Sequence, residues 1–309
     1  MANLPCVVKL AVTGGAGFIG SYLVKRLIRQ GHDVTVVDSL YRGTLENLAS
    51  VSKEIEFHKT DITDFEALRD ILKDMDGIFH EAALTDVQES FTKQEEYHKV
   101  NVAGTENIFK IAKEFGLKVV YASSSSVYGN PQRIPIMEDS ERKPINPYGN
   151  TKLEDEFLAE RYSKEGVSIL GLRYFNVYGK GQTGSYAGVI TKFINKLREK
   201  RPPVIFGDGK QIRDFVFVED VAQANIVAMK CNVRNGFFNV GTGITTSIES
   251  LARVLIDISG LKLEPIYESP LEGDVQISQA DTTLTKKVLD WEYKIGLREG
   301  LEEFFPLSN

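Results

Sequence analysis

The stretch that most constrains the fold of this chain runs from Ala11 to Ser39 and reads AVTGGAGFIGSYLVKRLIRQGHDVTVVDS. It sets glycines at every third position between two short apolar runs, at 7–12 and 34–37. Apolar residues recur at helical spacing between positions 19 and 28, and Gly31 stands where a helix should end. The stretch therefore predicts a strand, a tight turn, a helix and a second strand, which together make one βαβ unit.

Three glycines and one acid in this unit predict a dinucleotide site. Gly14, Gly17 and Gly20 would allow, in turn, a tight turn, close approach of the backbone to a pyrophosphate, and close packing of helix on strand. The free N–H groups at the start of the helix would face the phosphates. Asp38 follows at the distance expected for a carboxylate that binds an adenosine ribose. Because a carboxylate would repel a 2′-phosphate, we expect NAD rather than NADP, although Arg42 could soften that preference.

The rest of the chain alternates in the same way. Strand-like runs at 55–58, 77–80, 119–122 and 168–173 are separated by helical segments, which predicts an α/β fold with a Rossmann-type, doubly wound parallel sheet. The alternation weakens after residue 176 and returns through the strand-like and helical run that starts near residue 212. We therefore expect an NAD-binding domain of 1–176 plus about 212–244. A smaller C-terminal α/β substrate lobe would comprise about 177–211 plus 245–309.

Composition narrows the possible partners. The chain has 309 residues and a formal net charge of −6, which argues against broad binding of nucleic acid or anionic membranes. Two distant cysteines, Cys6 and Cys231, and four histidines without ligand spacing suggest neither a disulfide framework nor a metal site. The sequence contains no signal-peptide pattern and no long apolar run, so we expect a cytoplasmic location.

A second motif carries the expected chemistry. Tyr148 and Lys152 stand four residues apart in a predicted helix, so their side chains would share one face. A phenol, with a reference pKa of about 10, is a poor base at neutral pH, but a nearby ammonium group favours the phenolate. The serine run at 123–126 ends a predicted strand and would bring a hydroxyl to the same crevice. Serines at a strand end are otherwise common turn formers, and Tyr–Lys pairs at this spacing also occur by chance.

The motifs gain meaning from their order along the chain. The sequence contains GGAGFIG, Asp38, the "DI" at Asp61, Asn101, SSSSVYG, NPYGNTK, LRYFNVYG and RDFVFVED. Over essentially the whole chain this series resembles the extended short-chain dehydrogenase/reductases that act on nucleotide sugars, and most of all the UDP-sugar 4-epimerases. The resemblance implies that Tyr148 removes the proton of the sugar 4-hydroxyl, that Lys152 tunes Tyr148, and that Ser124 binds the same oxygen. Ser123 and Ser125 leave the last assignment open by one place.

The resemblance also implies two sets of binding residues. For NAD these are Gly14, Gly17, Phe18, Ile19, Gly20, Asp38, Asp61, Ile62, Ala82, Asn101, Tyr148, Lys152, Tyr174 and Val177. For the nucleotide sugar they are Ser124, Ser125, Tyr148, Asn176, Val189, Arg213, Asp274 and Ser278. A guanidinium suits phosphate oxygens, although an ordinary charge before a strand is the alternative for Arg213.

The residues around the predicted catalytic motif indicate which of the family's reactions to expect. Dehydratases of this family carry an Asp–Glu pair where this chain has Ser125 and Ser126, and the UDP-glucuronate decarboxylases carry a glutamate at the position of Ser126. With hydroxyls alone, the site can move a proton at O4 and a hydride at C4. This favours 4-epimerisation of a UDP-hexose through a transient 4-keto sugar, with no net oxidation or reduction.

Substrate and assembly follow from the same resemblance. The small Ser278 stands where a tyrosine of the family excludes an N-acetyl group, so we expect interconversion of UDP-GlcNAc and UDP-GalNAc alongside that of UDP-glucose and UDP-galactose. The alternative is that Ser278 is simply a polar residue in a loop. Leu271 replaces the arginine that usually binds the diphosphate in this family, and this loss should weaken binding by on the order of 1.5 to 3 kcal/mol unless another cation substitutes.

The resemblance also implies a homodimer through helices at about 87–115 and 152–164. The alternatives are a UDP-glucuronate 4-epimerase, another nucleotide-sugar reductase or dehydrogenase, and a non-catalytic NAD-binding regulator.

Overall fold

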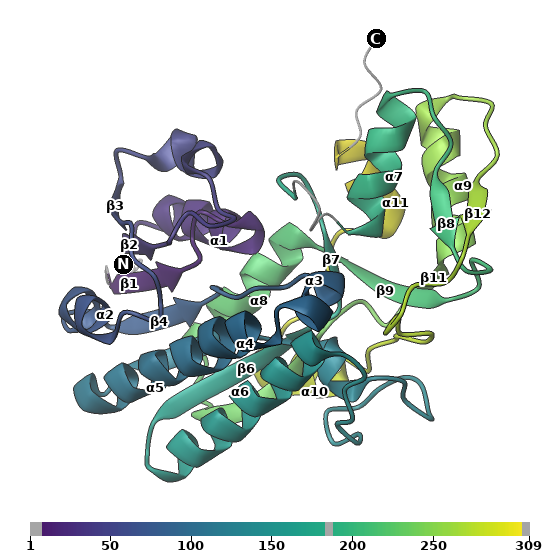
Figure 1. Cartoon of the computed structure of the whole chain (residues 1–309). Helices are drawn as coiled ribbons and strands as arrows, with labels where there is room; N and C mark the ends of the chain where they lie inside the picture. The colour runs from purple at the N-terminus through teal and green to yellow at the C-terminus, as the bar shows by residue number, and fades with distance from the viewer. Residues whose placement is uncertain (1–7, 183–187, 305–309) are drawn as a thin grey trace.

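A computed structural model describes residues 8–182 and 188–304, and its main feature is a seven-stranded parallel sheet (Figure 1). The strand order is β10-β6-β5-β4-β1-β2-β3, and all six pairings are parallel. The strands are β1 (Lys9–Thr13), β2 (Asp33–Val37), β3 (Ile55–His58), β4 (Gly77–His80), β5 (Lys118–Ser124), β6 (Ser168–Tyr174) and β10 (Asn235–Val240). The predicted doubly wound sheet is confirmed.

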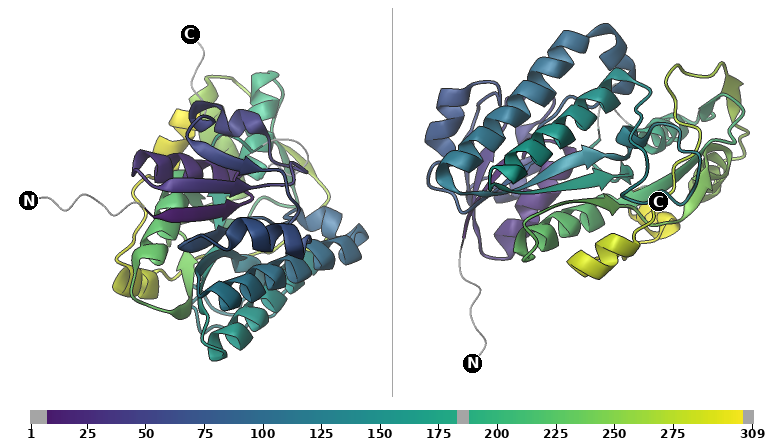
Figure 2. Two further views of the ribbon diagram at one scale, coloured as in Figure 1. Left: turned by 90° about the vertical axis from the view of Figure 1, so that its left-hand side faces the viewer. Right: turned by 90° about the horizontal axis from the view of Figure 1, so that it is seen from below.

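Helices cover both faces of this sheet, as the views in Figure 2 make plain. Along β1, Leu10 and Val12 face one hydrophobic cluster and Ala11 faces another, because successive side chains of a strand point to opposite faces. The first cluster includes α1 (Phe18–Arg29) and α8 (Val218–Lys230). The second includes α2 (Phe65–Leu72), α5 (Gly104–Phe115) and α6 (Pro147–Lys164). The short helices η1 (Leu45–Val51) and η3 (Ser125–Tyr128) follow β2 and β5.

The later part of the chain builds two small sheets. The first pairs β7 (Asn176–Tyr178), β9 (Ile212–Phe217) and β11 (Thr245–Ser247), and the second pairs β8 (Val204–Phe206) with β12 (Ile266–Glu268). Near the small sheets lie α7 (Val189–Arg198), α9 (Ile248–Ser259) and α11 (Leu297–Phe304), at the upper right of Figure 1. Helix α10 (Thr283–Leu289) lies beside β10 and α8.

The segment that starts near residue 212, which was expected to return to the first lobe, joins the large sheet only in part. Helix α8 and strand β10 join the large sheet, but β9 belongs to a three-stranded sheet. The reason lies in its alternation: Phe215 and Phe217 pack into the cluster beside α7 and α9, while Val216 packs into the core of the large sheet. Strand β9 therefore lies between the two cores, and the division of the chain into two lobes stays a prediction.

The expectation of one long helix over 87–115 is wrong in one respect. The structure has four consecutive helical elements there, with a break at Lys93. These are α3 (Val87–Thr92), α4 (Gln94–Tyr97), the π-helical segment η2 (His98–Ala103) and α5. Lys93 leaves the helical backbone, with φ of −124° and ψ of 40°. Within the described ranges, no helix is long and apolar enough to cross a membrane. Cys6 lies outside those ranges.

Candidate active site

The loop between β1 and α1 presents bare backbone at the carboxyl end of the sheet. A Cβ atom on Gly14, which has φ of +68°, would lie 2.7 Å from the backbone nitrogen of Ala82, and one on Gly20 would lie 2.2 Å from the Gly14 carbonyl oxygen. Neither position can therefore hold a side chain. Helix α1 begins after Gly17, which offers no side-chain cap to the N–H groups of the first turn. This arrangement fits a pyrophosphate at the start of α1, where the sequence predicts NAD.

The end of β2 carries the predicted ribose-binding acid. Asp38 is buried, and its carboxylate accepts hydrogen bonds from the backbone N–H groups of Ala16, at 3.0 Å, and Leu40, at 2.8 Å. Burial raises the pKa of Asp38, and these two hydrogen bonds oppose the rise. Arg42 forms an ion pair with Glu89 and lies 3.4 Å from the hydroxyl of Tyr97. That ion pair weighs against Arg42 as a partner for a 2′-phosphate.

The other cofactor candidates come from several elements, and two of them, Asn101 and Asp61, already have protein partners. The side-chain amide of the buried Asn101 accepts a hydrogen bond from Leu84 N, at 2.7 Å, and donates to Leu84 O, at 2.9 Å, and to Thr151 Oγ1, at 3.0 Å. Asp61 is exposed and binds the backbone and hydroxyl of Thr63. The cofactor roles of all these residues stay predictions. The remaining candidates are placed by their elements: Phe18 and Ile19 start α1, Ile62 packs under Gly104, Ala82 follows β4, Tyr174 ends β6 and Val177 lies in β7.

Helix α6 carries the predicted catalytic pair at its N-terminal end. Asn146 caps the helix by accepting a hydrogen bond from Gly149 N at 2.8 Å, and Pro147 occupies its first turn. Tyr148 is half-buried, and its backbone N–H donates to Ser90 Oγ of α3 at 3.2 Å. Lys152, one turn later, is buried. The structure thus places both residues beside the carboxyl end of β5.

Strand β5 decides between two of the candidate serines. Ser123 is buried and donates a hydrogen bond to Glu156 Oε1 at 2.7 Å. Because neighbouring side chains on a strand point to opposite faces, Ser124 points away from this contact and accepts a hydrogen bond from Ser126 N at 3.1 Å. Ser123 is thus committed to the protein interior. The geometry favours Ser124 over Ser123, and its catalytic role stays a prediction, as does that of the half-buried Ser125.

Two of the predicted substrate residues meet each other. Arg213, in β9, is buried, and its Nη2 lies 2.6 Å from Oδ1 of Asp274. Burial lowers the pKa of Arg213, and the ion pair with Asp274 opposes that shift. The buried Ser278 lies close by, because its backbone N–H donates to Ile212 O at 3.2 Å. Leu271 is exposed, while Asn176 starts β7 and Val189 starts α7.

Sequence reasoning missed a set of buried charges behind helix α6. Arg173 binds both carboxylate oxygens of Glu156, at 2.8 and 2.9 Å. Glu81 accepts a hydrogen bond from the hydroxyl of Tyr174 at 2.8 Å, and burial raises the pKa of Glu81 to about 7. Asp155 lies against Lys152. The one available signal was helical spacing, since Asp155 and Glu156 follow Lys152 by three and four residues.

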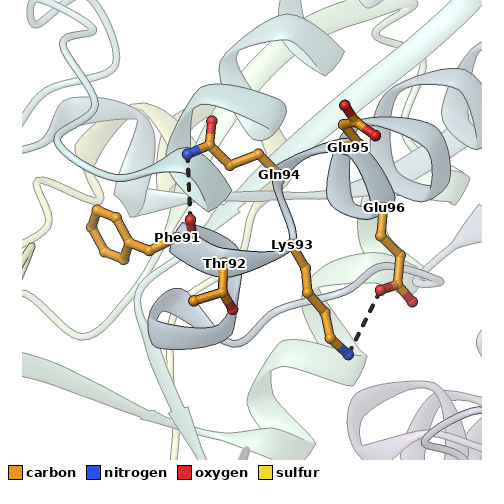
Figure 3. Close-up of a pocket in the computed structure, with 6 residues that line it drawn as sticks. All are labelled: Phe91, Thr92, Lys93, Gln94, Glu95 and Glu96. Carbon is orange, nitrogen blue, oxygen red and sulfur yellow. Dashed lines mark hydrogen bonds and ion pairs between the residues drawn. The ribbon is translucent and has the colours of Figure 1, made fainter.

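A surface pocket on the turn between α3 and α4 is a separate feature (Figure 3). Six consecutive residues, 91–96, line it, and the side chain of Lys93 pairs there with Glu96 at 3.6 Å. None of the predicted site residues is among the six. No group of three or more histidine, cysteine or acidic residues that could hold a metal ion occurs in the part of the chain that the structure describes.

Known proteins resemble this chain over nearly its full length. A putative UDP-glucose 4-epimerase of Methanocaldococcus jannaschii is 38% identical over 298 residues, covering 95% of this chain and 96% of that protein. A UDP-glucose 4-epimerase of Thermotoga maritima, crystallised with UDP-glucose, superposes with a TM-score of 0.92 at 36% identity, covering 96% of this chain and 97% of the other. A UDP-N-acetylglucosamine 4-epimerase of Methanobrevibacter ruminantium, in complex with UDP-N-acetylmuramic acid, gives 0.93 at 34% identity, covering 97% of each chain.

A protein family accounts for these likenesses. Residues 10–241 match the NAD dependent epimerase/dehydratase family, a span that runs from β1 to the end of β10 and includes the glycine loop, Ser124 and the Tyr148–Lys152 pair. The match covers most of the chain and agrees with the motif order. The chain therefore belongs to the NAD dependent epimerase/dehydratase family.

Proposed function

We propose that this protein is an NAD-dependent UDP-hexose 4-epimerase that interconverts UDP-GlcNAc and UDP-GalNAc and also acts on UDP-glucose and UDP-galactose. The observation that carries the proposal is the composition of the catalytic end of the sheet. Ser124 ends β5, Tyr148 and Lys152 begin α6, and positions 125 and 126 hold hydroxyls in place of acids. Such a set suits proton transfer at one oxygen and lacks the acid–base pair that elimination would need.

In this proposal the chain's own residues hold the sugar and move one proton. Tyr148, as phenolate, takes the proton of the 4-hydroxyl, and Ser124 donates a hydrogen bond to the same oxygen. The buried Lys152 supplies a fixed positive charge that favours the phenolate. NAD, when bound on the glycine loop, would supply reversible hydride chemistry at C4, and inversion there requires that the sugar turn over in the site between the two hydride transfers. The same Tyr148 then returns the proton.

The substrate assignment is supported by the region around β9. Ser278 is small and lies beside Ile212, which leaves no bulky aromatic ring at that position. Arg213 offers a guanidinium for a diphosphate, although its ion pair with Asp274 means that binding would have to share or break this contact. The proteins of T. maritima and M. ruminantium, named for UDP-glucose and UDP-N-acetylglucosamine, span the two substrates that we propose.

The experiment is direct conversion of the nucleotide sugars. Purified protein is incubated with NAD and, separately, with UDP-GlcNAc, UDP-glucose and UDP-glucuronate, and the galacto isomers are quantified by NMR. We expect conversion of UDP-GlcNAc and UDP-glucose without growth of absorbance at 340 nm, since no reduced cofactor should accumulate. Replacing Tyr148 by Phe should lower the rate about 10²- to 10⁴-fold, whereas Tyr267→Phe, at an exposed tyrosine of β12, should not. Lasting absorbance at 340 nm would favour a dehydrogenase or reductase.

We also propose that the protein forms a homodimer through α5 and α6, and that it works in the cytoplasm. A partner on α6 would cover Phe157, a large apolar side chain exposed on that helix, and would so bury apolar area.

A further inference from the structure

A buried carboxylate lies against the lysine of the predicted catalytic pair. Asp155 follows Lys152 by three residues on α6, so the two share one face of the helix. The Nζ of Lys152 is 3.2 Å from Oδ2 of Asp155, and the two side chains are 3% and 0% exposed. At this depth bulk salt and water screen the pair very little. The function proposed above gives Asp155 no role.

The surroundings of this pair are mixed in charge. Burial raises the pKa of Asp155 to about 7, and Lys152 opposes the rise. The charge of Glu154, on the same helix, also raises the pKa of Asp155. Thr105 of α5 and Tyr121 of β5 lie near Asp155. On its other side, Lys152 faces His80 and Glu81 at the end of β4. Above neutral pH, Asp155 is therefore a negative charge held in contact with the ammonium group on which the predicted chemistry depends.

We propose that Asp155 is a positioning residue that fixes the Lys152 ammonium group and limits how strongly this ammonium acidifies the phenol of Tyr148. The physical reason is that the field of Lys152 at Tyr148, one helical turn away, is partly cancelled by a carboxylate on the same helix face. The phenolate is then less favoured than it would be beside an unpaired lysine. This role rests on the proposed function, because it takes Tyr148 as the base.

The test measures the titration of Tyr148 without substrate. In protein labelled with ¹³C at the tyrosine Cζ, the signal lost in Tyr148→Phe identifies Tyr148, and its chemical shift is followed against pH. Asp155→Asn keeps an oxygen that can accept from Lys152 but removes the charge. We expect the titration midpoint of Tyr148 to fall by about one pH unit. The acid limb of kcat/KM against pH, measured with NAD bound, should shift in the same direction.

A matched control separates this effect from a general change of charge. Glu154→Gln removes the same charge one position away, from a carboxylate that pairs with the exposed His98 at 3.1 Å, and it should leave the midpoint unchanged. If Asp155→Asn does not fold, Asp155→Ala serves, with the same expected shift. A midpoint that is unchanged or higher overturns the proposal. Because the titration needs no turnover, it stands even if no sugar is converted, a result that would overturn only the proposed function.

Discussion

At the scale of single residues, the neutral form of His80 joins three elements beneath the site. Its Nδ1 lies 2.7 Å from Thr13 Oγ1 of β1, and its Nε2 lies 2.9 Å from Thr105 Oγ1 of α5. Burial, with a smaller contribution from Lys152, lowers the pKa of His80 to about 3. The folded protein therefore keeps this ring uncharged, next to a buried ammonium group, over the whole range in which free histidine takes up a proton.

This predicts a specific loss of stability in acid. Between pH 6.5 and 3 the unfolded chain binds a proton at His80 and the folded chain does not. The free energy of unfolding is therefore unaffected above pH 6.5. Below that pH it falls by up to about 1.4 kcal/mol per pH unit. His80→Asn should cost about 1 to 3 kcal/mol at pH 7, because buried threonine hydroxyls lose a partner. Urea unfolding at pH 7 and pH 5 should find the gap between wild type and variant narrowed at pH 5. A constant gap would contradict this assignment.

Residues set by local spacing could be predicted, and residues set by packing could not. The glycines, Asp38, Tyr148 and Lys152 stand out because a loop or a helix face fixes their relations over a few positions. Glu154 and Asp155 are adjacent acids, yet the first pairs with an exposed histidine and the second is buried against Lys152. Helical spacing favours Asp155, three residues after Lys152, over Glu154, two residues after it, but only the packing of α6 on the sheet buries the pair.

At the scale of elements, a buried ion pair joins helix α6, which carries the predicted catalytic pair, to the sheet. Glu156 of α6 binds the guanidinium of Arg173 of β6 through both oxygens, and one of these oxygens also accepts the hydroxyl of Ser123 in β5. Arg173 donates further, to Tyr128 and to the Glu138 carbonyl, both at 2.7 Å. The pair therefore holds α6, with Tyr148 and Lys152, in register with the strand that ends at Ser124.

Breaking this pair from one side should be costly. Glu156→Gln would leave the charge of Arg173 buried without its carboxylate, and we expect a loss of about 3 to 5 kcal/mol in the free energy of unfolding, measured in urea. Arg142 also contacts Glu156, at 3.0 Å, but its side chain is 24% exposed. Arg142→Gln should therefore cost at most about 1 kcal/mol. Equal, small losses in the two variants would show that the buried pair does not anchor α6.

Helices and strands could be predicted where the alternation of strand-like and helical segments continued along the chain. The βα alternation predicted the large sheet, whereas β10, a six-residue strand at its edge, was missed, and β9 was expected to return with the first lobe. The break at Lys93 was missed because the helix over 87–115 was expected from the family resemblance, although the five residues 92–96 between Phe91 and Tyr97 are all polar. There, Tyr97 donates its hydroxyl to the Asp86 carbonyl at 2.8 Å, a contact between α4 and the residue that precedes α3.

At the scale of the whole molecule, the C-terminal segment is tied back to the large sheet through α8. The carboxylate of Asp220 accepts hydrogen bonds from the backbone N–H groups of Lys294 and Ile295, each at 3.0 Å, and its carbonyl accepts from the buried indole of Trp291 at 3.0 Å. These contacts join residues more than 70 positions apart. No short-range pattern in the sequence could predict them, although they fix how α11 approaches the core.

The proposed dimer gives the last prediction. Phe157 is 51% exposed on α6, with the guanidinium of Arg142 lying 5.1 Å from the centre of its ring. A partner that covers this side chain would bury apolar area, so a charge there should oppose association. We expect sedimentation at micromolar concentration to give twice the chain mass for wild type and a single chain for Phe157→Glu. Ile244→Glu, which charges a 57% exposed side chain between β10 and β11, should remain dimeric. A single-chain mass for wild type, or a dimeric Phe157→Glu, would contradict an interface at α6.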